Sequence, residues 1–442
     1  MATVIIGGGI IGASTAYYLT NDTSVHKSQP VHVIESSSQP FSAASGYAGG
    51  FLARDWFSSA TAALGALSFD LHKKLAEEHG GAEKWGYMES IALNLDVSEH
   101  AKRRGGSRGD DWLRVGTSRA DAASKSHEAQ ISPLDSAPAW LTKQQYGHVE
   151  VISNPGTVAQ VDPRRLCEFL KDITIERGVR WHAPVRVLSV RKDSETNAIE
   201  GVVVLNSESQ TESFIPCKNI VICAGPWTQS VFEALFPSSS LRLRVSPLAG
   251  YSLVIRSPRH SLVQEQQTYQ GRSHAIFTTH PRDCGFSPEL FSRHGGEIYI
   301  AGLNSSTIPL PSQAEESKEI MDREKIQDLK RVAVRLMGKL TEGHNESSAD
   351  VPNEDDLEVL REGLCFRPVT DTGRPIVSRV PDNALGSGLK SDTSAPGRER
   401  GGVFIATGHG PWGISQSLGT GRVMADLVDG IKPSVNIDAL QL

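Results

Sequence analysis

Cysteine is scarce in this sequence, and its placement argues against two kinds of small domain. The 442 residues contain five cysteines and no CxxC pair; they are Cys167, Cys217, Cys223, Cys284 and Cys365. An odd number of cysteines without paired spacing fits neither a disulfide framework nor a cysteine zinc site. We therefore expect a reducing compartment and no metal site.

Long hydrophobic runs and a basic excess are also missing. No stretch approaches the roughly 18 unbroken apolar residues that a membrane-spanning helix requires. The apolar run over residues 4–11 contains three glycines and lacks preceding basic residues, so a signal peptide is not expected. The 45 basic and 51 acidic residues leave a net charge of −6, which argues against a dedicated nucleic-acid-binding protein. The length predicts a globular protein of two or three domains.

Glycine, by contrast, is well represented, with 41 residues gathered in short clusters. The first cluster, Gly7-Gly8-Gly9-Ile10-Ile11-Gly12, fits the GxGxxG dinucleotide fingerprint. Gly7 permits the sharp turn out of a strand over 3–6, and Gly9 lets the backbone approach a pyrophosphate. Gly12 allows the following helix, expected over 10–20, to pack closely on that strand. The pyrophosphate is then expected at the helix N-terminus, where free N–H groups and the dipole favour an anion.

An acidic residue at the expected distance strengthens this interpretation. Glu35 ends a second apolar strand over 31–34, 23 positions after Gly12. The fingerprint places a carboxylate that accepts the ribose hydroxyls about 20 residues beyond the glycines. A glycine-rich turn with an incidental acid is the alternative. The motif alone does not separate NAD from FAD.

Further elements of a long chain are needed to complete such a site. We expect a helix over 166–174 and strands over 181–190, 201–205, 219–223 and 402–406, and a strand-rich region over 240–310. A glycine loop and a helix over 419–427 follow the last strand. Ile326, Leu329, Ala333, Leu336 and Leu340 mark an amphipathic helix whose stripe predicts core packing. The basic run 102–108 is a candidate phosphate patch, but Asp110 and Asp111 follow it, which favours a surface loop.

Three of these segments resemble one family. Residues 219–227 (NIVICAGPW), 363–375 (GLCFRPVTDTGRP) and 403–414 (VFIATGHGPWGI) are similar to flavin-site segments of the D-amino-acid oxidase, glycine oxidase and sarcosine oxidase superfamily. Residues 156–170 resemble the helix before the family's adenine-side strand. Residues 45–56 (SGYAGGFLARDW) and 274–304 are similar to fungal members.

This resemblance implies an α/β fold in two discontinuous domains. A doubly wound, Rossmann-like FAD-binding domain would take residues 1–57, 151–235 and 357–442. A mostly antiparallel substrate-binding domain would take residues 58–150 and 236–356.

FAD is the implied cofactor. The six mostly small residues from Ser45 to Gly50 would let the chain pass the flavin ring, and a helix opening at Gly410–Ile414 would aim N–H groups at it. The residues expected to bind the cofactor are Gly7, Gly9, Ile10, Ile11, Gly12, Glu35, Ser45, Gly46, Ala48, Gly49, Gly50, Val185, Ala224, Gly225, Trp227, Cys365, Gly408, Gly410, Trp412, Gly413 and Ile414.

Three residues are candidates for catalysis. Arg367 lies where amino-acid oxidases of the family carry the arginine that pairs with the substrate carboxylate, a task that suits a forked guanidinium. His409 could tune the flavin or position substrate, or it could stabilise its loop. Arg54, close to Tyr47 and Trp56, could serve a carboxylate or oxygen activation, although a lone arginine is more often on the surface.

Cys365 matches the cysteine that carries a thioether-linked flavin in the sarcosine oxidase branch. Its presence together with Arg367 is a mixed signature, because that branch does not usually use this arginine. That branch also has a lysine where this chain has Trp412. A buried cysteine with no reactive role is the alternative. His274 and His280 are expected to be ordinary surface or core histidines.

The resemblance implies oxidation of a small-molecule amine or amino acid to an imine, with molecular oxygen reoxidising the flavin to give hydrogen peroxide. A dehydrogenase on the same scaffold is one alternative. A non-catalytic flavoprotein is another, supported by polar insertions over 98–128, 342–356 and 383–402. The expected location is cytoplasmic; endosomal or peroxisomal association stays open, although residues 440–442 (LQL) differ from a peroxisomal SKL. The sequence does not indicate an oligomeric state.

Overall fold

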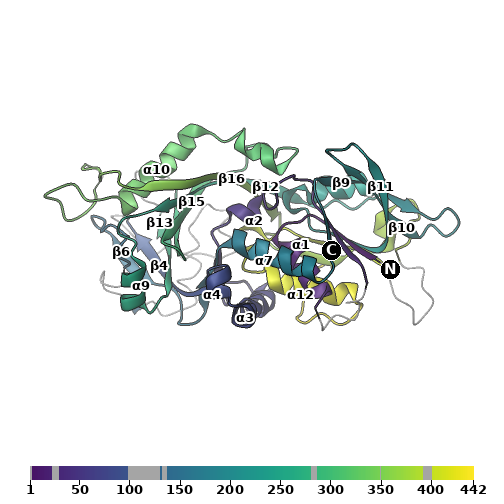
Figure 1. Cartoon of the computed structure of the whole chain (residues 1–442), viewed down its shortest axis with the longest axis horizontal. Coiled ribbons are helices and arrows are strands. Elements are labelled where there is room, and N and C mark those ends of the chain that lie inside the picture. The colour runs from purple at the N-terminus through teal and green to yellow at the C-terminus, as the bar shows by residue number, and fades with distance from the viewer. Residues whose placement is uncertain are drawn as a thin grey trace.

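The computed structural model describes residues 2–21, 29–97, 130–131, 137–279, 286–348, 350–391 and 401–442. Within them the chain forms two β-sheets with helices packed against them (Figure 1). The described α-helices are α1 (Ile10–Leu19), α2 (Ala44–Tyr47), α3 (Ala62–His79), α4 (Gly81–Lys84), α7 (Pro163–Glu176), α8 (Thr228–Leu235), α9 (Leu262–Tyr269), α10 (Arg323–Met337), α11 (Asp382–Leu385) and α12 (Ser417–Val428). Among these, no helix has the length and apolarity to cross a membrane.

The first sheet has a parallel centre. Its path runs β17 (Ile376–Arg379), β18 (Gly402–Thr407), β11 (Glu212–Ile222), β1 (Ala2–Ile6), β2 (Val31–Ile34) and β8 (Arg180–His182). All neighbours on this path are parallel except the edge pair β17–β18. The strands β10 (Ile199–Asn206) and β9 (Val185–Lys192) extend β11 as an antiparallel arm. Both chain ends lie in this half of the molecule (Figure 1).

Helices cover both faces of this sheet. Because successive strand residues point to opposite faces, Ile5 packs in a core with α1, α3, α7 and α12. Val4 and Ile6 point the other way, into a core with Phe232 of α8. A parallel sheet buried on both faces is the doubly wound arrangement. The fold class predicted from the sequence is confirmed.

The second sheet is mostly antiparallel. Its path runs β16 (Glu358–Thr370), β12 (Val245–Arg256), β15 (Glu297–Ser305), β14 (Glu289–Arg293), β13 (Ser273–Thr279), β4 (Met88–Asp96), β6 (His148–Val151) and β5 (Gln130–Ile131), and β7 (Val158–Gln160) joins β4 to β3 (Phe51–Ala53). Among the described strands of this second sheet, only the pair β13–β4 is parallel. By pairing, β3, β7 and β16 belong to this sheet, although the expected domain ranges grouped their residues with the first. The division into two domains stays a prediction.

The second sheet offers one face to a helix and the other to a cavity. Ile298 and Ile300 of β15 pack with the apolar stripe of α10, which lies along β12 and β16 in Figure 1. The alternate residues Tyr299 and Ala301 line the cavity. The apolar stripe of α10 is therefore packed in the core, as predicted from the sequence. The helix, however, ends at Met337, before the expected Leu340, because Gly338 caps it in an extended conformation.

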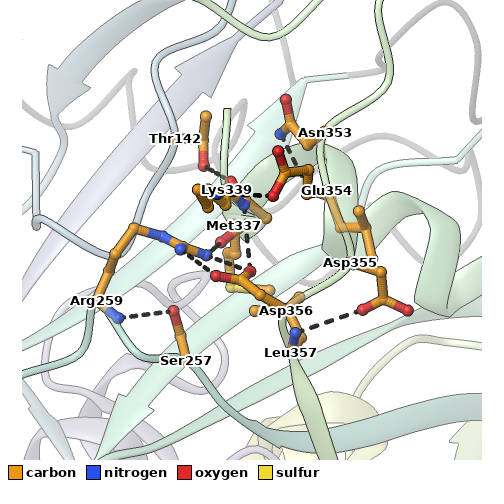
Figure 2. A network of polar contacts seen from close by, with 12 residues as sticks. Thr142, Ser257, Arg259, Met337, Lys339, Asn353, Glu354, Asp355, Asp356 and Leu357 are labelled. Carbon is orange, nitrogen blue, oxygen red and sulfur yellow. Dashed lines mark hydrogen bonds and ion pairs between the residues drawn. The ribbon is translucent and has the colours of Figure 1, made fainter. Parts of the chain in front are cut away.

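A polar network holds that helix end in place (Figure 2). Arg259 donates two hydrogen bonds to the carboxylate of Asp356, at 2.6 and 2.9 Å, and another to the carbonyl of Met337. Thr142 donates to the carbonyl of Gly338 at 2.7 Å. Side chains thereby satisfy carbonyls that a helix C-terminus leaves without intrahelical partners.

Candidate active site

A cavity of about 380 Å³ opens where the parallel strands end. Ile6 ends β1, Cys223 follows β11, and Thr407 ends β18; all three line it. This is the edge of a doubly wound sheet at which ligands bind. The opposite wall comes from the second sheet, chiefly from Phe291 and Tyr299.

The glycine loop forms a cradle that side chains would fill. Gly7 has a φ of +108°, and a Cβ there would lie 2.5 Å from the carbonyl oxygen of Cys223. A Cβ at Gly12 would lie 2.0 Å from the carbonyl oxygen of Gly7. At Gly9 a Cβ would lie 3.1 Å from Ser45 Oγ. At residues 7 and 12 only glycine allows this close approach of strand and helix.

The helix after the loop has an N-cap residue without a side chain. Gly9 is the N-cap of α1 and provides no side-chain hydrogen bond, and the first turn carries no acidic residue. The N–H of Ile10 donates to Ser45 Oγ at 2.9 Å, which brings Ser45 to the helix N-terminus. Ile11 also lines the cavity. The other N–H groups of the first turn and the helix dipole suit the pyrophosphate of a dinucleotide.

Glu35 lies at the same edge, one strand away. Its Oε2 accepts from the N–H of Gly8 and its Oε1 from the N–H of Ser37, both at 2.9 Å. Burial raises the pKa of Glu35, and the two N–H donors oppose that rise. Val185 donates its N–H to the Glu35 carbonyl at 2.8 Å and lines the cavity. The acid and the start of β9 thus lie together at one end of the cavity, where the resemblance leads us to expect the nucleoside; we call it the nucleoside end.

A segment of the second half of the chain closes over this end. Ser312, Gln313 and Ala314 line the cavity. The indole N–H of Trp227 donates to the carbonyl of Pro311 at 2.8 Å. Glu315, in the 3₁₀ turn η3 (Ala314–Lys318), accepts from the N–H of Ser38 at 2.6 Å and from two nearby hydroxyls. No sequence pattern pointed to this closing segment, because none of its residues belongs to a motif.

The small-residue segment after β2 also lines the cavity. Ala48 and Gly49 are both in the wall. A Cβ at Gly49 would lie 2.5 Å from the ring of Phe291. Arg293 of β14 donates to the carbonyls of Ala48 and Gly49, at 2.6 and 2.9 Å. This segment is therefore pinned by the second sheet.

Arg367 lies in the cavity wall on β16. Its Nη1 donates to Asn304 Oδ1 at 2.6 Å. Its guanidinium rests over Gly250 of the neighbouring strand, where an added Cβ would lie 2.8 Å from Nη1. Cys365, two residues earlier on the same face, is buried and also lines the cavity; burial raises the pKa of its thiol.

His409 lines the cavity at the C-terminal glycine loop. It is buried, and its Nε2 lies 2.9 Å from Thr420 Oγ1. Burial lowers the pKa of His409 to about 3, so the imidazole is neutral at physiological pH. The loop-stabilising contact weighed from the sequence is present.

The backbone after His409 differs from the expectation. Residues 410–412 form a 3₁₀ turn, η4 (Gly410–Trp412), and α12 begins only at Ser417. Pro411, within the turn, has no N–H to donate. Gly410, Gly413 and Ile414 still line the cavity. His72 of α3 holds this loop from behind, with Nε2 3.0 Å from the carbonyl of Ile414; no sequence pattern pointed to His72.

Most expected cofactor residues are brought together, and some are not. Ala224, Gly225 and Trp227 line the cavity, as do the residues described above. The wall does not include Gly12, Gly46, Gly50, Gly408 or Trp412. These glycines serve close packing instead; a Cβ at Gly46 would lie 2.2 Å from the Phe41 carbonyl oxygen. Trp412 packs in an aromatic cluster with Phe51 and Phe57.

Arg54 was expected in the site, but the structure places it outside the cavity. Its side chain is 46% exposed and forms a two-pronged ion pair with Asp70, at 3.0 and 3.2 Å. It is not part of the cavity wall. Trp56 is buried in the aromatic cluster, and Tyr47 packs under the guanidinium of Arg361, 5.3 Å from the ring centroid.

The two histidines of the substrate region, His274 and His280, were expected to be ordinary. His274 is a core residue, with Nδ1 3.4 Å from Glu265 Oε2. His280, Cys284 and residues 98–128, which include the basic run 102–108, lie outside the described residues.

The comparisons with known proteins agree with this geometry. The family model described as FAD dependent oxidoreductase (DAO) matches residues 2–427. A Schizosaccharomyces pombe protein, whose name assigns it provisionally to the oxidoreductases, is 25% identical over 99% of this chain and 96% of its own. Glycine oxidase of Bacillus licheniformis is 23% identical, over 97% of this chain and 93% of its own.

Solved structures show the same fold. The crystal structure of glycine oxidase from Geobacillus kaustophilus superposes with a TM-score of 0.67 at 20% identity, covering 100% of this chain and 97% of the other. The glycine cradle, the helix that begins at Gly9 and the buried acid fit FAD in this chain as well. The chain belongs to the DAO family of FAD-dependent oxidoreductases and is an enzyme.

Proposed function

We propose that this enzyme oxidises the C–N bond of an amine or amino acid to an imine and passes the electrons to molecular oxygen, giving hydrogen peroxide. The observation that carries the proposal is Arg367, a guanidinium in the wall of the cavity that takes FAD. Its positive charge favours an amino acid over a simple amine. When bound, FAD supplies the hydride acceptor.

Arg367 would bind the substrate carboxylate. A guanidinium offers two parallel N–H groups to a carboxylate, and this charge-assisted pair offsets the loss of water. Asn304 already occupies Nη1, which fixes the plane of the fork. Gly250 leaves the space in which the guanidinium lies. The chain thereby orients the substrate before any bond breaks.

The remaining wall would keep water from the reacting carbon. Phe291 and Tyr299 stack with centroids 5.9 Å apart and planes within 3°. Both rings are buried. Burial raises the pKa of Tyr299, so its hydroxyl stays protonated. Because His409 is neutral, its imidazole can donate or accept a hydrogen bond without adding charge to the cavity.

For the cofactor, we propose that the glycine loop and the N-terminus of α1 bind the pyrophosphate, and that Glu35 receives the ribose hydroxyls. The C-terminal loop at Gly410–Ile414 would face the flavin. Covalent attachment through Cys365 is a second proposal, favoured by the position of this residue in the wall. Its raised pKa opposes formation of the thiolate that attachment needs.

One experiment tests the attachment directly. After acid precipitation, yellow colour that stays in the supernatant shows that FAD is not covalently bound. A pellet that stays yellow in wild type and loses its colour in Cys365→Ser identifies Cys365 as the attachment point.

The decisive experiment on function is an anaerobic panel of amines and amino acids, scored by loss of flavin absorbance. We expect amino acids to bleach the flavin, and air to restore the colour with one peroxide formed per substrate. If air does not restore the colour but a quinone or dye acceptor does, the enzyme is a dehydrogenase and not an oxidase. Failure of every amine and amino acid would reject the proposed substrate class.

We also propose a cytoplasmic location, because Cys167, Cys217, Cys223 and Cys365 are buried and free. A tagged chain that fractionates with an oxidising compartment would contradict it.

A further inference from the structure

Arg293 of β14 is a buried cation beside the cofactor cavity, and the proposed reaction gives it no role. It is 4% exposed. Its Nη2 donates to the carbonyls of Ala48 and Gly49, and its guanidinium lies over the ring of Tyr299, 4.8 Å from the centroid. All three of those neighbours line the cavity. Arg293 is therefore one layer behind the wall.

The charge on Arg293 is not neutralised by direct contact. Among the described residues, no carboxylate lies within ion-pair distance of it, and its buried Nε has no hydrogen-bond partner. Asp162 and Glu297 act on it only at longer range, and Arg361 opposes them. Burial lowers the pKa of Arg293, but an arginine keeps its proton in proteins.

Burying a cation without a carboxylate partner is unfavourable. Two carbonyl contacts and one ring offset part of that penalty, yet a neutral residue could fill this position at lower cost. The arrangement becomes favourable when negative charge appears close by. A flavin that accepts two electrons develops negative charge, and the cavity is where it would do so.

We propose that Arg293 is a positioning residue with an electrostatic role: it pins Ala48 and Gly49 against the cofactor, and its charge stabilises the reduced flavin. The inference depends on FAD binding and not on which substrate the enzyme takes. It is therefore tested without any substrate.

The measurement is the midpoint potential of the bound flavin, determined by anaerobic reductive titration against a reference dye. In Arg293→Met we expect the equilibrium constant for two-electron reduction to fall about tenfold, which corresponds to a midpoint about 30 mV lower. Arg293→Lys keeps the charge and should stay within about threefold of wild type. Arg54→Met, which removes an exposed arginine outside the cavity, should leave the potential unchanged.

Two outcomes would overturn the proposal. An unchanged midpoint in Arg293→Met would show that the charge does not reach the flavin. Equal losses in Arg293→Met and Arg293→Lys would show that packing, and not charge, is responsible. If the methionine variant does not fold, Arg293→Gln keeps an N–H donor for the two carbonyls and removes only the charge. The same two readings then apply to it.

Discussion

The guanidinium of Arg367 occupies the space that the missing side chain of Gly250 leaves on the adjacent strand. The two residues are on neighbouring antiparallel strands, where Gly250 pairs with Cys365 and Leu248 with Arg367. Arg367 therefore reaches back along the sheet, and a Cβ at Gly250 would lie within 3.0 Å of three guanidinium atoms. The position of the charge in the cavity depends on a residue that contributes no chemistry.

Gly250→Ala should displace this guanidinium while leaving the flavin site intact. A misplacement of about 1 Å at a reacting site can lower the rate about 100-fold, so we expect kcat/KM for an amino acid to fall by about 10–100-fold. FAD content and the flavin spectrum should not change. Unaltered kcat/KM for amino acids would show that Arg367 can shift without consequence.

Arg367→Ala should remove the cation that we expect to bind the substrate carboxylate. We expect a loss of about 2–5 kcal/mol of transition-state stabilisation for an amino acid, as for other severed buried charge pairs. Arg367→Lys should recover only part, since an ammonium cannot make the planar two-pronged contact.

The measurement for these variants is kcat/KM for a matched acid and amine in wild type and mutant. The amine, which has no carboxylate, should be affected far less by either change. Equal losses for acid and amine would assign Arg367 a structural role only.

Gly9→Leu should abolish retention of FAD. A side chain at residue 9 would enter the space over Ser45 and the N-terminus of α1, where we place the pyrophosphate. The measurement is the ratio of flavin to protein absorbance after gel filtration and attempted reconstitution. Circular dichroism should show that the variant is folded, and a folded variant that keeps its flavin would contradict the placement.

Local rules made the glycine cradle predictable from the sequence. The turn at Gly7 and the contact at Gly12 require glycine wherever a strand, a turn and a helix meet at a dinucleotide. Arg367 and the C-terminal loop were found through resemblance, and Arg54 was misplaced because adjacency in sequence does not reveal its partner, Asp70. The helix expected over 419–427 is present as α12, but residues 410–412, where a helix was expected to open, form a 3₁₀ turn instead.

Contacts between distant residues were beyond prediction. The bonds from Arg293 to Ala48 and from Ser38 to Glu315 join residues 245 and 277 positions apart. No motif or periodicity records such a pair, since each partner is ordinary in its own segment. These contacts set the shape of the cavity, which is the part of the site that depends most on tertiary structure.

Two buried histidines should make stability depend on pH. Burial lowers the pKa of His72 to about 4 and that of His409 to about 3, against an ordinary value of about 6.5 in the unfolded chain. Below pH 6.5 the unfolded chain binds protons that the folded chain does not, so each histidine lowers stability as pH falls, by about 1.4 kcal/mol per pH unit.

The free energy of unfolding of wild type and His409→Gln, measured by denaturant titration at pH 7, 6 and 5, checks this. We expect the variant to be less stable at pH 7, through loss of the contact with Thr420, and to lose less stability on acidification. Parallel pH dependences for the two proteins would show that His409 also protonates in the folded state.

The segment that closes over the nucleoside end has a consequence for how the cofactor leaves. Pro311 is held by Trp227 and Glu315 by Ser38, so a dinucleotide bound as we propose would be enclosed between two parts of the chain that meet only in the folded protein. Its escape would then require these bonds to part, and its residence time would depend on local opening as well as on affinity. Dilute denaturant should accelerate release before the protein unfolds, and an apoenzyme should capture FAD slowly even when the final complex is tight.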